Sequence, residues 1–222
     1  MTGAHRAVAV AVAVAAGASA APSPARAADD GDLVLAGLGM AVPTYLLGVA
    51  VHEGSHAVAA RWMGYEVTRL QLLPGRHPRT GVFYFGYTQV RGRMSRAQRT
   101  WFLLAPKLTD TALLGGFAAV ALTDSLPAND YAQLALTVLA TGFWVDFAKD
   151  VVAWRATNDI VRVYAAHGLA SEWQRLPWRT LHFALAVGAG YAIARSYADL
   201  FGGDAEASAA MPIAIPLVAG TF

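Results

Sequence analysis

The sequence predicts a mainly α-helical membrane protein with about four transmembrane helices and a small membrane-associated β-hairpin between the first and the second. Of the 222 residues, 56% are hydrophobic and only 14% are charged, and this balance is too apolar for an ordinary soluble domain. The absence of cysteine excludes disulfides and thiolate metal sites. No glycine-rich nucleotide motif and no basic-aromatic pattern is present, so no nucleic-acid partner is expected.

Residues 1–27 are expected to form a secretory signal peptide. An alanine-valine core at residues 7–21 is followed by a small-x-small cleavage site at residues 25–27. The alternative is an uncleaved N-terminal anchor. Pro22 and Pro24 favour cleavage because they end any helix that continues from the core.

The rest of the chain divides into a polytopic membrane domain, residues 28–198, and a C-terminal tail, residues 199–222, whose apolar last part, residues 211–222, is too short to span a membrane. A helix needs about 20 apolar residues to cross the hydrocarbon core. Pro43 is expected to kink or interrupt the first span near its middle. A loop rich in proline and glycine at residues 74–81 separates two β-like runs and predicts the hairpin. The four apolar runs cover residues 33–51, 101–123, 131–154 and 180–197.

Basic residues are segregated along the chain and predict its orientation. Residues 57–101 hold eight arginines and one acid, and residues 149–179 hold five lysines and arginines. The connector at residues 124–130 and the chain after residue 199 hold no lysine or arginine. By the positive-inside rule, we expect a multi-pass protein of the cell membrane whose mature N-terminus is outside and whose arginine-rich loops are cytoplasmic.

The strongest chemical signal is His52-Glu53-Gly54-Ser55-His56, which reads H-E-x-x-H at the end of the first apolar run. Positions i and i+4 share one face of a helix, so the two histidines can bind one Zn²⁺ ion. Glu53, next to the first ligand, is placed to act as a general base toward a zinc-activated water. The alternative is a chance trio on a surface helix. Apolar flanks argue against it, because ionisable groups in such a helix are costly unless they are paired or metal-bound.

The order of features resembles the site-2 protease family of intramembrane zinc metalloproteases. The resemblance is carried by the H-E-x-x-H helix, Gly64, the hairpin, an apolar helix with Leu104-Ala105-Pro106, and the pair Asn158-Asp159. It implies that two histidines and an aspartate bind zinc, that the glutamate activates water, and that a membrane-spanning or membrane-associated protein is cut at the lipid bilayer. In this chain, Thr157-Asn158-Asp159-Ile160 stands where the family commonly has an Asn-Pro-Asp-Gly-like motif.

Three aspartates compete for the role of third ligand. Asp110 has a partner in Lys107, one helical turn away. Asp146 has no cation three or four residues before it, although a lysine follows three residues later. Asp159, beside Asn158, could simply cap a helix. The resemblance favours Asp159, with Asp146 second.

Two other functions stay open. A protein of the same fold could bind zinc or partners without hydrolysis, and loss of the third ligand would mark it. Alternatively, a structural or transport protein could use Lys107, Asp110 and Asp146 as a polar pathway, with an incidental histidine pair.

Overall fold

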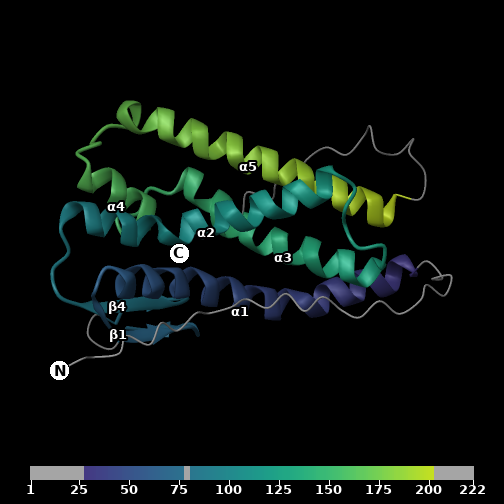
Figure 1. The fold of residues 1–222 in the computed structure, drawn as a ribbon, viewed down its shortest axis with the longest axis horizontal. Helices are drawn as coiled ribbons and strands as arrows, with labels where there is room; N and C mark the ends of the chain where they lie inside the picture. The colour runs from purple at the N-terminus through teal and green to yellow at the C-terminus, as the bar shows by residue number, and fades with distance from the viewer. Residues whose placement is uncertain (1–27, 78–80, 203–222) are drawn as a thin grey trace, which may run out of the picture.

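Helices make up most of the described chain, and a small β-hairpin lies at one end of them (Figure 1). The computed structural model describes residues 28–77 and 81–202, so the expected signal peptide and most of the tail lie outside the described residues. The elements are α1 Asp30–Trp62, β1 Glu66–Gln71, β2 Gly75–Arg76, β3 Phe83–Tyr84, β4 Tyr87–Arg91, α2 Arg96–Leu122, α3 Asp130–Ala148, the 3-10 helix η1 Lys149–Val152, α4 Asp159–Ala166 and α5 Glu172–Phe201.

The first helix, α1, is 33 residues long and includes Pro43 without a break. The expected interruption is therefore wrong: a proline removes one backbone donor, and helices packed among other helices tolerate that loss. The helix ends in a tight reversal at Gly64, whose φ of +85° is strained for other residues. There the Tyr65 N–H donates to the Ala60 carbonyl at 2.9 Å, which closes the last turn.

The predicted hairpin is present and has two parts. Strands β1 and β4 pair antiparallel, with a register shift between Val67 and Arg69, and the short strands β2 and β3 pair at the tip. Both β1 and β4 contact α1. The hairpin therefore lies against the helix that carries the H-E-x-x-H sequence.

The core of the bundle lies between α2, α3 and α5. Helix α3 packs against α1, α2 and α5, and α2 packs against α1. Helices α1 and α3 approach closely at Gly142 of α3, where an added Cβ would overlap the side chain of Thr44 in α1. The buried apolar residues of this core are Leu114, Ala140, Phe143, Phe147, Ala186 and Ile193.

Helix boundaries differ from the apolar runs where caps decide them. Helix α5 begins at Glu172, eight residues before the run at 180–197, because Ser171 and Gln174 form a capping box. The run at 131–154 splits at Ala148 into α3 and η1. Hydropathy marks the apolar part of a helix, whereas side-chain hydrogen bonds set where the helix starts.

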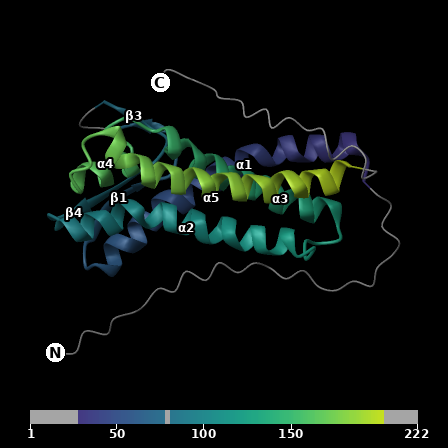
Figure 2. The ribbon, with the colours of Figure 1, turned by 90° about the horizontal axis from the view of Figure 1, so that it is seen from above.

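Large apolar side chains are exposed along the outer faces of the bundle, as on α1, where Leu35 is 69% and Leu38 is 67% exposed. In the described part of the chain, α1 and α2 are long and apolar enough to cross a membrane. The loop between α2 and α3 lies at one end of the bundle, whereas the hairpin and α4 lie at the other, in two views turned by 90° (Figure 1, Figure 2).

Candidate metal centre

The candidate site contains two imidazole rings from α1. His52 and His56 lie one turn apart on the same face, with ring centroids 5.2 Å apart. His56 is 4% exposed, so its ring is almost completely enclosed by protein. The spacing of the H-E-x-x-H sequence on a continuous helix is sufficient to explain this pairing.

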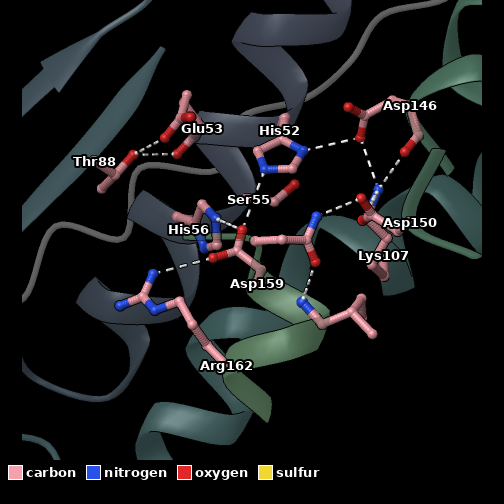
Figure 3. A network of polar contacts seen from close by, with 12 residues as sticks. His52, Glu53, Ser55, His56, Thr88, Lys107, Asp146, Asp150, Asp159 and Arg162 are labelled. Atoms are coloured by element: carbon pink, nitrogen blue, oxygen red, sulfur yellow. Dashed lines mark hydrogen bonds and ion pairs between the residues drawn. The ribbon is translucent and has the colours of Figure 1, made fainter. Parts of the chain in front are cut away.

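Asp159 reaches the histidines from α4, about a hundred residues later in the chain. Its Oδ2 lies 3.0 Å from His56 Nε2 and 3.5 Å from His52 Nε2. Asn158 caps α4 by accepting from the N–H groups of Ile160 and Val161 at 3.0 and 3.3 Å. Because Asn158 does the capping, the Asp159 side chain is available to the histidines (Figure 3).

The electrostatic surroundings of Asp159 keep it ionised. Burial alone would raise the pKa of this carboxyl, but the adjacent His52 and His56 rings outweigh burial and hold the pKa below its usual range. Its other oxygen, Oδ1, pairs with Arg162 at 3.2 Å. Oδ2 therefore faces the histidines as a charged acceptor.

The remaining nitrogen of each ring has its own acceptor. His56 Nδ1 lies 2.7 Å from the Phe102 carbonyl oxygen, and His52 Nδ1 lies 2.9 Å from Asp146 Oδ2. A carbonyl oxygen can only accept, so His56 donates through Nδ1–H. In a neutral ring the lone pair is then on Nε2, which is the nitrogen that faces Asp159.

These atoms suit a metal ion of the size and geometry of Zn²⁺. One ligand atom each from His52, His56 and Asp159 lies within 4.8 Å of the others. Tetrahedral zinc with bonds of about 2.0–2.1 Å places its ligand atoms about 3.3 Å apart. The two distances from Asp159 Oδ2 to the imidazole nitrogens, 3.0 and 3.5 Å, bracket that value. In metal sites, a histidine ligand typically donates a hydrogen bond from its second ring nitrogen to a carbonyl or carboxylate oxygen.

Glu53 lies beside the candidate ligands, and its hydrogen-bond partner belongs to the hairpin. It is 8% exposed, and the Thr88 hydroxyl lies 2.8 Å from its Oε2 and 2.9 Å from its backbone oxygen. Strand β4 can come this close because Gly86 precedes it. A Cβ at Gly86 would lie 2.7 Å from Val49 Cγ1 and 2.9 Å from Glu53 Cγ.

The other two candidate aspartates lie in a buried cluster around Lys107. Asp110 pairs with Lys107 at 3.1 Å, as the spacing predicts, and is not among the three clustered metal-ligand residues found in the described chain. Asp146 contacts His52 through the nitrogen that faces away from Asp159. Asp150 also joins this cluster, with its Oδ2 at 3.1 Å from Lys107 Nζ. The sequence does not predict this contact, because it depends on how α2 and η1 pack.

One of the comparisons with known proteins identifies a family. The family model described as Peptidase M50B-like matches residues 32–214, which is well over half of the chain. The chain belongs to the Peptidase M50B-like family. This is a family of the site-2 protease type, so the resemblance seen in the sequence is confirmed. Neither a curated protein nor a solved structure matches the chain significantly.

Membership of the M50B-like family fixes the general class of the protein. It indicates a membrane-embedded metallopeptidase of site-2 protease type, and such peptidases are generally zinc-dependent. The H-E-x-x-H sequence, the hairpin strands and Asp159 all lie within the matched range.

Proposed function

We propose that the protein is a zinc-dependent endopeptidase that cuts membrane-spanning or membrane-associated proteins. The observation that carries the proposal is the convergence of His52 Nε2, His56 Nε2 and Asp159 Oδ2, with Glu53 on the same helix turn. Three acceptor atoms this close repel one another unless a cation or protons lie between them. A family of membrane metallopeptidases supplies the reason to choose a metal ion.

The chemistry assigns a separate role to each residue. His52, His56 and Asp159 would hold zinc, which when bound polarises the scissile carbonyl and acidifies a water molecule. Glu53 would accept the proton of that water and transfer it to the leaving amine. Thr88, which contacts the Glu53 carboxylate at 2.8 Å, would keep that base in place. A substrate helix has to unwind locally, because helical carbonyls are hidden in backbone hydrogen bonds.

We also propose four membrane spans, formed by α1, α2, α3 and α5, with the arginine-rich end in the cytoplasm. The two arginine-rich segments, residues 57–101 and 149–179, meet at the hairpin end of the bundle (Figure 1). The opposite end is acidic: Arg195 pairs there with Asp124 at 2.6 Å, and Asp130 accepts from the backbone of Ala28 at 2.9 Å. This charge difference supports the proposed orientation.

Metal content tests the proposed chemistry most directly. We expect one zinc per purified chain, cleavage of a reporter membrane peptide, loss of cleavage with a zinc chelator, and recovery when zinc is added back. Asp159→Asn should lose most of the zinc, whereas Asp146→Asn should retain most of it. The reverse pattern would make Asp146 the third ligand. Zinc binding without cleavage of membrane peptides would instead favour the non-catalytic alternative.

Labelling of introduced cysteines tests the topology, because the natural chain has none. Arg93 and Ala128 are exposed and belong to the β4–α2 and α2–α3 connections, which lie at opposite ends of the bundle (Figure 1). In intact cells, an impermeant thiol reagent should label Ala128→Cys and should label Arg93→Cys only after the membrane is opened. Labelling of Arg93→Cys from outside would overturn the orientation.

A further inference from the structure

Asp146 lies on the side of His52 that faces away from the proposed zinc. His52 Nδ1 is 2.9 Å from Asp146 Oδ2, and His52 Nε2 is 3.5 Å from Asp159 Oδ2. The two aspartates therefore contact opposite edges of one imidazole ring (Figure 3). Of these two aspartates, only Asp159 also contacts His56, so the two carboxylates have different surroundings.

Two lysines fix the Asp146 carboxylate. Lys107 Nζ lies 2.8 Å from Asp146 Oδ2 and 2.8 Å from its backbone oxygen, while Lys149 contacts Oδ1. Lys107 is itself buried and lies 3.1 Å from both Asp110 and Asp150. Asp146 cannot turn away from His52 without giving up bonds to a buried ammonium group, which is costly.

The same cluster reaches the other side of the site. The Asn158 side-chain amide donates to Asp150 Oδ1 at 2.7 Å, and Asn158 directly precedes Asp159. The buried Lys107 cluster is thus connected to His52 through Asp146 and to the start of α4 through Asp150. Both connections consist of charge-assisted hydrogen bonds, which are the stronger kind.

The two lysines around Asp146 determine which hydrogen bond its carboxylate can form with His52. An ammonium group can only donate, so a carboxylate with a lysine on each oxygen acts as an acceptor. His52 must then donate through Nδ1–H. In a neutral imidazole this leaves the lone pair on Nε2, on the edge that faces Asp159 and His56.

We propose that Asp146 is a positioning residue, which accepts the Nδ1 proton of His52 and so presents Nε2 to the metal, while Lys107 holds Asp146 in place. The inference rests on the proposed zinc site. Carboxylate–histidine pairs of this kind orient the ring and raise its basicity, and losing one typically costs about 10- to 100-fold in metal affinity.

The test compares alanine variants of two aspartates from the same cluster. Both Asp146 and Asp110 contact Lys107, at 2.8 and 3.1 Å, but only Asp146 contacts a histidine. In full-length protein, competition with a chromophoric chelator should show a loss of zinc affinity of about 10- to 100-fold for Asp146→Ala. The loss for Asp110→Ala should be within about threefold. Asp146→Asn keeps one oxygen for His52 and should recover much of the affinity.

A spectroscopic measurement separates positioning from general stability. In zinc-loaded protein with nitrogen-15 histidine, the ring signals report which nitrogen carries the proton. Asp146→Ala should change the His52 signals and leave those of His56 as they are, because His56 Nδ1 is held by the backbone carbonyl of Phe102. The six histidines of the chain make such spectra simple to assign by substitution.

Three results would overturn the inference: unchanged zinc affinity in Asp146→Ala, an equal loss in Asp110→Ala, or unchanged His52 signals. If the alanine variant does not fold, Asp146→Asn against Asp110→Asn decides, with a loss of about two- to tenfold expected only in the former. Wild-type protein that binds no zinc would instead reject the proposed function itself.

Discussion

The two halves of the site are built from different kinds of secondary structure. The half proposed to bind the metal consists of side chains from α1 and α4, which have hydrogen-bond partners in the helices, such as the Phe102 carbonyl, 2.7 Å from His56 Nδ1. The half that holds Glu53 depends on a two-stranded sheet, whose Thr88 hydroxyl lies 2.8 Å from the carboxylate. Small sheets are less stable than packed helices. The proposed ligands are therefore held by the helices, whereas the position of Glu53, the proposed base, depends on the hairpin.

The largest expected effect comes from the helical half. His56→Ala removes a proposed ligand whose ring is enclosed and stacked on Phe102, with centroids 4.5 Å apart. Zinc affinity should fall by more than the roughly hundredfold that marks the loss of a supporting residue. Cleavage should fall with it. Zinc content measured by atomic absorption checks this, and full retention of zinc would remove His56 from the ligand set.

Glu53→Gln should abolish the function of one half of the site and leave the other half unchanged. The amide cannot accept a proton from water, so cleavage of a membrane peptide should fall by about 10²- to 10⁴-fold. Zinc content should stay at the wild-type value, because Glu53 is not one of the three clustered ligands. A variant that cleaves at the wild-type rate would show that another group is the base.

Gly86→Ala probes the contact between hairpin and helix. The new Cβ would lie 2.7 Å from Val49 Cγ1 and 3.0 Å from the Gln71 backbone oxygen, and the backbone cannot easily move. Overpacking of this kind costs about 1–3 kcal/mol. Thermal unfolding in detergent should show the loss, together with reduced cleavage at unchanged zinc affinity. Gly54→Ala is the matched control, since nothing lies within 4 Å of a Cβ there.

Thr88→Val should give the smallest effect, confined to the base. Removing one hydroxyl that contacts the Glu53 carboxylate should lower kcat by about tenfold, equivalent to about 1.4 kcal/mol. Thr88→Ser keeps the hydroxyl and should retain most of the rate. If valine and serine behave alike, the hydroxyl does not position Glu53.

How far the sequence predicts this molecule depends on how local each feature is. The histidine pair needs only the period of one helix, and the hairpin needs only two β-like runs around a loop of breakers. Asp159 was indicated by family resemblance, because nothing in residues 52–56 specifies a partner about a hundred residues later. The structure places it beside both histidines, and its role as a ligand stays a prediction.

What the sequence does not show are contacts that depend on packing. The Phe102 carbonyl has no side-chain signature, and Thr88 reaches Glu53 only because β4 crosses α1 at Gly86. The sequence makes Asp146 a candidate ligand because no cation lies three or four residues before it. In the fold, Lys107 from another helix supplies that cation at 2.8 Å.

The length of α1 has a consequence for the products of the proposed cleavage. At about 1.5 Å per residue, His52 lies about 33 Å along the helix from Asp30, which is close to the full thickness of a hydrocarbon core. A substrate helix beside α1 would then be cut near the arginine-rich surface and not at mid-depth. The two fragments would be unequal in hydrophobic length. The long one would stay anchored in lipid, and the short one would be free to leave into the aqueous phase on that side.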